Sequence, residues 1–177
     1  MMLDEYVELA QRTANTHTVA DKIGHALLGL IGEAGELVDI VKKYTYMDMR
    51  REKAKEMLKL ELGDMMWYLA ELCVGTGIPL SGLWADAGML SLRDEANLQD
   101  AVAEVSYEAV MLYRTRRVLN SPDLTRQAAT MILAGVMRLA GRIGASMEEI
   151  MDLNIEKLRT RYGDRFDADK SNARYEA

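Results

Sequence analysis

Two stretches of the chain carry paired carboxylates inside otherwise apolar runs. In residues 59–69 the acids are Glu61 and Asp64, and in residues 26–38 they are Glu33 and Glu36. A helix turns through about 100° per residue, so positions three apart share one face. Apolar residues cover most of the remaining circumference, which is typical of a buried helix. The pattern predicts two buried helices, each with both carboxylates on one side.

The same periodicity runs along the rest of the chain and predicts an all-α fold. Only Pro79 and Pro122 occur, and alternation of the strand type is absent. We expect one domain over residues 1–177, beginning with an amphipathic helix over residues 3–14 and the acidic helix pair over residues 21–75. Ser121 before Pro122 starts a further helix. Ser146 opens a capping box for a helix over residues 146–162, before a polar tail over residues 163–177.

Residues 85–138 are interpreted as a degenerate second helical repeat. Residues 101–110 loosely echo the first acidic helix, and residues 139–150 resemble residues 72–83 in their order of helix end, glycine turn and helix start. Residues 128–134 stand where the second acid pair would fall, and they contain no acid. We therefore expect a packing partner and not a second site.

Glycines accompany both acid pairs, at Gly32, Gly35 and Gly63. Glycine inside a helix costs about 1 kcal/mol relative to alanine, so its repeated use predicts close backbone approach at these positions. If the two helices pack antiparallel, four carboxylates face one another, and their repulsion requires bound protons or cations. Oxygen ligands alone favour Mg²⁺ or Mn²⁺.

Composition narrows the possible partners and the compartment. The formal net charge is −6 and no dense Lys/Arg stripe occurs, which argues against a nucleic-acid partner. No apolar stretch approaches the roughly 20 residues that span a bilayer, and the first residues lack a basic and apolar leader. The single cysteine, Cys73, fits a reducing compartment. We expect a cytoplasmic protein with no membrane partner.

A polar stripe on the last predicted helix is a candidate phosphate-binding face. Asn154, Lys157 and Arg161 follow at i, i+3 and i+7. Cations near a helix C-terminus are also common as plain surface charge. Trp67 lies one turn beyond Asp64 on nearly the same face, where it either stacks on a ligand or fills the core.

Taken together, these motifs resemble a known family. Glu33-x-x-Glu36, 24 further residues and Glu61-x-x-Asp64 resemble the signature of the all-α nucleoside triphosphate pyrophosphatases. This MazG-like superfamily includes dimeric dUTPases and phosphoribosyl-ATP pyrophosphohydrolases. Residues 154–162 resemble a C-terminal segment of phage and bacterial members. The resemblance covers about residues 3–84 and 139–167, and it implies a helical bundle of the MazG-like type.

The resemblance implies an activity and a set of site residues. Mg²⁺, with Mn²⁺ as a possible substitute, would be held by the four acids Glu33, Glu36, Glu61 and Asp64. Water would cleave a nucleoside triphosphate between the α- and β-phosphates, giving a monophosphate and pyrophosphate. Substrate contacts would come from Asn154, Lys157, Arg161, Tyr162 and Trp67. Members form homo-oligomers, so a dimer or tetramer is expected.

One departure and several alternatives stay open. Many members carry another glutamate where this chain has Gly32, which leaves the group that takes the proton from water undecided. The substrate could be dGTP in a phage-type enzyme of the phage-infected or bacterial cytoplasm, dUTP, or (d)NTPs in general. A non-catalytic helical dimerisation module is the alternative of another class. A di-iron bundle is disfavoured because it needs Glu-x-x-His, which does not occur here.

Overall fold

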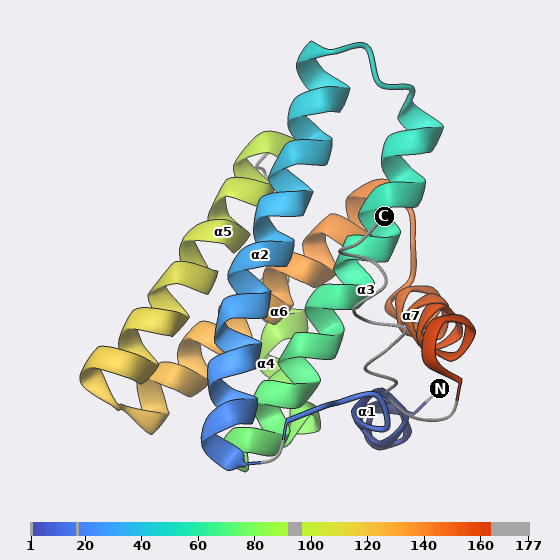
Figure 1. Ribbon diagram of the computed structural model, residues 1–177. Helices are drawn as coiled ribbons and strands as arrows, with labels where there is room; N and C mark the ends of the chain where they lie inside the picture. The colour runs from blue at the N-terminus through green and yellow to red at the C-terminus, as the bar shows by residue number, and fades with distance from the viewer. Residues whose placement is uncertain (1, 17, 92–96, 164–177) are drawn as a thin grey trace, which may run out of the picture.

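The described part of the chain forms helices and the turns between them, which confirms the all-α prediction. The computed structural model describes residues 2–16, 18–91 and 97–163. Figure 1 shows the helices in this order: α1 (Leu3–Gln11), α2 (Val19–Tyr46), α3 (Arg51–Thr76), α4 (Leu80–Ser91), α5 (Leu98–Arg114), α6 (Pro122–Ile143) and α7 (Met147–Tyr162). A π-helical segment, Thr115–Leu119, lies between α5 and α6.

The two long helices α2 and α3 form an antiparallel hairpin, as the acidic pattern predicts (Figure 1). The Thr18 hydroxyl accepts a hydrogen bond from the Asp21 backbone N–H, and the Asp21 carboxylate accepts one from Thr18. This capping box starts α2 at Val19, two residues earlier than predicted. Gly77, with φ of 73°, ends α3 in the left-handed conformation that favours glycine.

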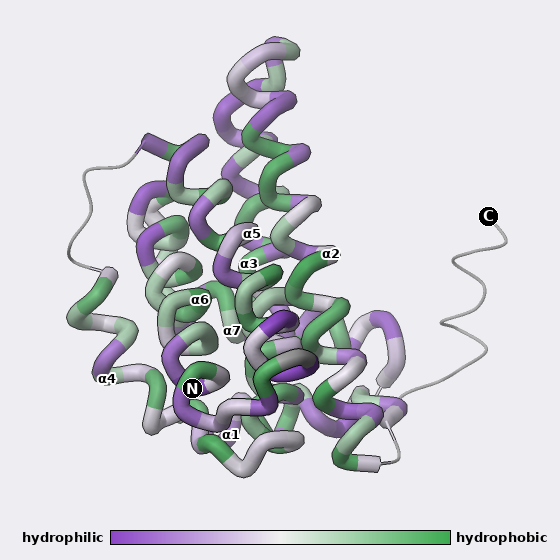
Figure 2. The backbone as a smooth tube through the Cα atoms, turned by 90° about the vertical axis from the view of Figure 1, so that its left-hand side faces the viewer, coloured by the Kyte–Doolittle hydropathy of each residue, from purple (hydrophilic) through white to green (hydrophobic). Residues whose placement is uncertain are grey.

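The core of the hairpin consists of side chains from the facing sides of both helices. Hydrophobic and hydrophilic turns alternate along the helices in Figure 2, as expected of amphipathic helices. The residues that are 0% exposed include Leu27, Leu30 and Leu37 of α2 and Leu62, Met66 and Leu69 of α3. On another side of α2, the Ser106 hydroxyl of α5 reaches the Ala34 carbonyl at 3.5 Å. α5 and α6 thus pack behind the hairpin and leave a different face of it to α1 and α7.

Helices α1 and α7 lie across the hairpin and appear nearly end-on in Figure 1. α1 ends at Gln11, three residues before the predicted end. Ser146 accepts a hydrogen bond from the Glu149 backbone N–H and starts α7 at Met147. The Glu149 carboxylate pairs with Lys59 of α3 instead of returning to the Ser146 backbone. The predicted capping box is therefore only half formed, because its acid ties α7 to α3.

The prediction of close backbone approach is right at one glycine and wrong at two. A Cβ at Gly63 would lie 3.0 Å from the Asn154 Cβ, so α7 does approach α3 there. A Cβ at Gly32 or Gly35 would meet nothing within 4 Å. Both residues are exposed, so they mark an open side of α2. The predicted tail falls almost wholly on residues 164–177, outside the described residues.

No described helix by itself has the length and apolar character needed to cross a bilayer. By length and composition alone, α6 and α7 meet that test only as a pair, across a bend of 99°.

Candidate active site

Three of the four predicted acids meet between α2 and α3. Carboxylate oxygens of Glu33, Glu61 and Asp64 lie within 4.8 Å of one another. All three side chains are half-buried, whereas the sequence pattern predicted buried ones. Glu36, one turn along α2 from Glu33, is exposed and lines the same cavity outside this cluster. The spacing of three residues leaves the two acids of α2 about 60° apart, so only one of them points fully at α3.

Burial and mutual repulsion both raise the pKa values in the cluster. Burial raises the pKa of Glu33 to about 8, with further contributions from the charges of Asp64 and Glu61. Burial and the charge of Asp64 also raise the pKa of Glu61. The Lys157 ammonium opposes both shifts. Without a cation, the cluster therefore retains a proton near neutral pH.

A buried relay of hydrogen bonds orients Asp64. The Tyr6 hydroxyl of α1 donates to Asn154 Oδ1 at 3.0 Å, and Asn154 Nδ2 donates to Asp64 Oδ1 at 2.9 Å. Tyr6 and Asn154 are almost wholly buried, and burial followed by the charge of Asp64 raises the pKa of the Tyr6 phenol. Gly63 makes room for the Asn154 side chain. The glycine beside the acid is therefore explained by the relay that holds the acid.

Positive charge reaches the cluster from α7. The Lys157 ammonium forms an ion pair with Asp64 Oδ2. Arg161, one turn further along α7, lines the same cavity and lies with its guanidinium carbon 5.7 Å from the centre of the Tyr162 ring. Asn154, by contrast, is 1% exposed and belongs to the relay. The predicted stripe is thus divided between a buried amide and two cations at the cavity.

The cavity that joins these groups has a volume of about 810 Å³, within the usual range for small-molecule sites. One end holds the four acids and the cations of α7. The other end is lined by Thr13, Asn15, Thr16, His25, Trp67 and Tyr68. A ligand that fills the cavity therefore meets charged groups at one end and aromatic rings at the other.

Trp67 ties α3 to α1 and borders the aromatic end. Its side chain is only 8% exposed, and the indole N–H donates to the Ala10 carbonyl at 2.9 Å and to Thr13 Oγ1 at 3.1 Å. Tyr68 is half-buried, and its ring centre lies 5.0 Å from the Trp67 ring in an edge-to-face arrangement. Because the indole nitrogen already has protein partners, Trp67 can offer a ligand only part of its ring.

The sequence analysis missed a second polar contact between the hairpin helices. His25 Nδ1 lies 2.6 Å from Glu71 Oε2, and the Glu71 side chain is 0% exposed. A signal for this contact exists in the sequence. Glu71 follows Asp64 by seven residues, and His25 precedes Glu33 by eight, so each continues the polar stripe of its own helix.

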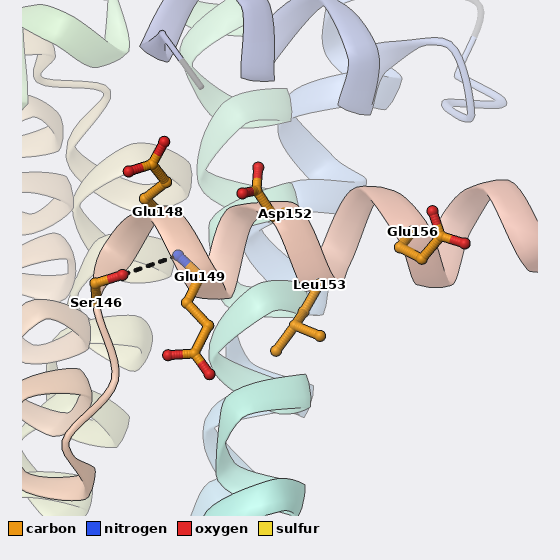
Figure 3. A pocket seen from close by; sticks show the side chains of 6 residues that line it. All are labelled: Ser146, Glu148, Glu149, Asp152, Leu153 and Glu156. Atoms are coloured by element: carbon orange, nitrogen blue, oxygen red, sulfur yellow. Dashed lines mark hydrogen bonds between the residues drawn. The ribbon is translucent and has the colours of Figure 1, made fainter.

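A second hollow lies along α7 and is shown in Figure 3. Its volume is about 610 Å³, and it shares none of its lining residues with the first cavity. Glu148 and Asp152 lie on one side of the helix in this view, and Glu149 lies on the other (Figure 3). Among the described residues, these acids form no cluster of the size that would hold a metal ion.

Comparison with known proteins finds one family model that matches the hairpin. Residues 23–77 match the model of the MazG nucleotide pyrophosphohydrolase domain. This range covers most of α2 and α3 and contains all four predicted acids. The helix pair is MazG-like. The resemblance inferred from the acid spacing is thus confirmed for this part of the chain.

A phage protein is also similar to part of this chain. The Gene 37 protein of Mycobacterium phage L5 is 38% identical over 52 residues, which cover 28% of this chain and 46% of that protein. The match thus spans a little under half the length of the phage protein. No solved structure matches the chain.

Proposed function

We propose that the chain is a Mg²⁺-dependent (deoxy)nucleoside triphosphate pyrophosphohydrolase. It would cleave between the α- and β-phosphates and release a nucleoside monophosphate and pyrophosphate. The observation that carries this proposal is the 810 Å³ cavity, in which clustered acids of a MazG-like hairpin face Lys157 and Arg161 of α7. Acids suit a divalent cation, and cations suit the phosphates that such an ion accompanies.

The residues present fit a divalent cation of the hard type. Their donors are carboxylate oxygens only, three of them within 4.8 Å, and burial together with the charges of Asp64 and Glu61 raises the pKa of Glu33. Glu33, Glu61 and Asp64 would hold Mg²⁺ or Mn²⁺, with Glu36 joining from the rim. A bound cation supplies charge neutralisation for the phosphates, orientation of the triphosphate and a more acidic water.

The remaining side chains take separate parts in this proposal. Lys157 and Arg161 bind phosphate oxygens, because both lie at the acidic end of the cavity and carry positive charge. Asn154 keeps Asp64 oriented through the buried relay. Tyr162 and the accessible part of Trp67 contact the nucleoside. Each of these roles rests on the position of the residue in or behind the cavity.

Water activation has to be arranged without a carboxylate at position 32. Gly32 offers no proton acceptor, so the proton lost by water passes to a carboxylate of the cluster. We assign this role to Glu33, which directly follows Gly32 and lies in the cluster. This role belongs to the same side chain that helps to hold the cation.

We also propose a homo-oligomer, either a dimer or a tetramer, and a single domain over the whole chain. Large apolar side chains are exposed on and beside α2: Leu28 at 63%, Tyr46 at 75% and Met47 at 64%. Contact with a second copy would cover them. In this proposal α5 and α6 form the degenerate repeat that supports the hairpin from behind.

The test is product analysis with every common (d)NTP. Phosphorus NMR with Mg²⁺, and separately with Mn²⁺, should show pyrophosphate and a monophosphate. The Asp64→Asn variant should show neither product. Release of orthophosphate, or no turnover of any triphosphate by the wild type, would overturn the proposal. A dGTP-directed phage-type enzyme, a dUTPase and a general (d)NTP enzyme are distinguished by the relative kcat/KM values in the same experiment.

The alternative of a non-catalytic dimerisation module makes the opposite prediction. It requires that Mg²⁺ leave the melting temperature unchanged and that no pyrophosphate appear. The wild type measured with and without Mg²⁺ decides between the two hypotheses.

A further inference from the structure

Three contacts between α2 and α3 follow one another along the facing sides of the hairpin. They are Glu33 with Glu61 and Asp64, Gly29 with Tyr68, and His25 with Glu71. At a rise of 1.5 Å per residue, successive contacts lie about 6 Å apart, which places His25 about 12 Å along α2 from Glu33. The dyad of His25 and Glu71 therefore stands at the aromatic end of the cavity whose acidic end holds the cluster.

The middle contact sets the shape of the cavity between its two ends. A Cβ at Gly29 would lie 2.1 Å from the Tyr68 ring, so only glycine lets this ring lie against α2. The Tyr68 ring is also tilted against the His25 ring, with centres 5.4 Å apart. The Tyr68 ring lines the cavity, where its face suits the sugar or base of a nucleoside.

The His25 ring is held through one nitrogen. Glu71 is wholly buried, its Oε2 faces His25 Nδ1 at 2.6 Å, and its Oε1 accepts a hydrogen bond from the Thr16 hydroxyl at 2.8 Å. A buried carboxylate only accepts hydrogen bonds and requires donors, so Nδ1 carries a proton. The His25 side chain is 49% exposed and lines the cavity, which leaves Nε2 for a ligand.

The charges around the ring favour its doubly protonated form. The hydrogen bond that Glu71 accepts from the ring raises the pKa of His25, while burial and the charge of Lys22 lower it, and the net direction is upward. The Lys22 ammonium itself contacts Gln11 and Thr16. The neighbouring rings of Trp67 and Tyr68 bring no charge to this end at neutral pH. Nε2 thus also tends to carry a proton and to act as a donor.

We propose that His25, positioned by Glu71, reads the nucleobase by donating a hydrogen bond from Nε2 to an acceptor on its edge. The inference rests on the proposed function, because phosphates at the acidic end direct the base towards His25. Guanine, uracil and thymine present a carbonyl oxygen where adenine and cytosine present an amino group. The site would therefore select keto bases.

The expected selectivity follows from the hydrogen bonds that are lost when an amino base occupies the site. An amino group facing the Nε2 proton places two donors against each other, and both lose their hydrogen bonds to water. Sites that hydrogen-bond one substrate group reject analogues without it by large factors. We expect at least about a tenfold preference for keto over amino bases.

Calorimetry with non-hydrolysable α,β-methylene triphosphates, in Mg²⁺, tests base reading without turnover. The wild type should bind the dGTP and dUTP analogues at least about tenfold more tightly than the dATP and dCTP analogues. His25→Phe should abolish this preference. His25→Gln, whose amide keeps a donor, should retain part of it. The matched control is Val74→Gln, at an exposed position of α3 outside the cavity, which should keep the wild-type preference.

The role of Glu71 has its own readout in the pH profile. The preference for keto bases should decline as pH rises through the pKa of His25, because the imidazolium exists below that value. Glu71→Gln removes the cause that raises this pKa, so the midpoint of the decline should move to lower pH. A midpoint that stays in place would show that Glu71 does not act on the ring.

Two results would overturn the inference: equal affinity for all four analogues, or a preference that His25→Phe leaves unchanged. Failure of the proposed function looks different. Selective binding without pyrophosphate release would refute the reaction and retain the base-reading role. Pyrophosphate release at equal kcat/KM from all four dNTPs would retain the reaction and refute the base-reading role.

Discussion

Two packed pairs of antiparallel helices, α5 with α6 and α2 with α3, differ in the groups that face their acidic side chains. In the pair α5 and α6, the Glu104 carboxylate meets Arg138 at 2.7 Å. In the MazG-like pair α2 and α3, Glu33 meets the acids Glu61 and Asp64. In one pair the cation comes from the partner helix itself, whereas in the other pair the acids face one another and the cation that meets Asp64 comes from α7.

The packing of the two pairs is otherwise similar. Gly29 of α2 receives the Tyr68 ring, and Gly135 of α6 receives a Val105 methyl group 2.3 Å from the position of a Cβ. Both pairs thus use a glycine to bring two helices together. A helix pair of this kind forms without clustered acids, so the cluster in α2 and α3 reflects a task other than folding.

The largest expected effect separates the acids of the two pairs. Glu61→Gln should lower kcat/KM for pyrophosphate release by on the order of 10²–10³-fold, because it removes a cation-holding oxygen where charge develops in the reaction. Glu104→Gln should leave kcat/KM within about twofold and weaken only an ion pair at a partly exposed site. Steady-state kinetics with Mg²⁺ measure both. Equal losses in the two variants would contradict a special role for the acids of α2 and α3.

Next in size is the effect of filling the two glycine contacts. Gly29→Ala and Gly135→Ala should each lower the free energy of unfolding by about 1–3 kcal/mol, since a ring or a branched side chain must move. Only Gly29→Ala should also raise KM, because the Tyr68 ring lines the cavity. Denaturant unfolding and kinetics of the folded fraction give the two values. An unchanged KM in Gly29→Ala would remove Tyr68 from the binding surface.

A smaller effect concerns pH and the metal-free protein. The raised pKa of Glu33 means that the folded state holds a proton that the unfolded state releases at lower pH. Stability from this group is present below about pH 4.5 and is lost as pH rises towards 8. Allowing for solvent screening, Tm should fall by roughly 3–6 °C between pH 5 and pH 8.5.

The matched controls for this pH effect are Mg²⁺ and a Glu33→Gln variant. Mg²⁺ should restore most of the lost Tm at pH 8.5, because it replaces the proton. Glu33→Gln should flatten the pH dependence. A Tm of the metal-free wild type that rises over this range would contradict the assigned pKa direction.

The smallest expected effect is stabilising and equal in the two pairs. A Cβ added at Gly24 of α2 or at Gly141 of α6 would meet nothing within 4 Å. Alanine at either position should raise the free energy of unfolding by about 0.5–1 kcal/mol through helix propensity. Thermal unfolding of the two variants checks this. Destabilisation by Gly24→Ala alone would indicate that a second copy covers this part of α2.

Much of the fold could be predicted because local signals fix it. The apolar periodicity gave the long helices, the Ser121-Pro122 start agrees with the structure, and the predicted end at residue 75 lies one residue before the end of α3 at Thr76. The start of α2 was misplaced by two residues because the capping box of Thr18 and Asp21 was not recognised. These features depend on neighbouring residues, which a sequence displays directly.

The site was less predictable, because it depends on the register between helices. The spacing identified the acids, but it could not decide that Glu33 would enter the cluster and Glu36 would stay at the rim. The glycines were misassigned for the same reason: the side chain that fills Gly29 belongs to another helix. The contact between His25 and Glu71 can be recognised only when the alignment of α2 against α3 is known.

The most direct test of the central claim is binding of Mn²⁺, followed through the loss of the free-ion signal in electron paramagnetic resonance. We expect saturable binding to the wild type, loss of binding in Glu61→Gln, and wild-type binding in Glu104→Gln. No saturable binding to the wild type, or equal binding to all three proteins, would contradict the claim that the acids of α2 and α3 form a site for a divalent cation.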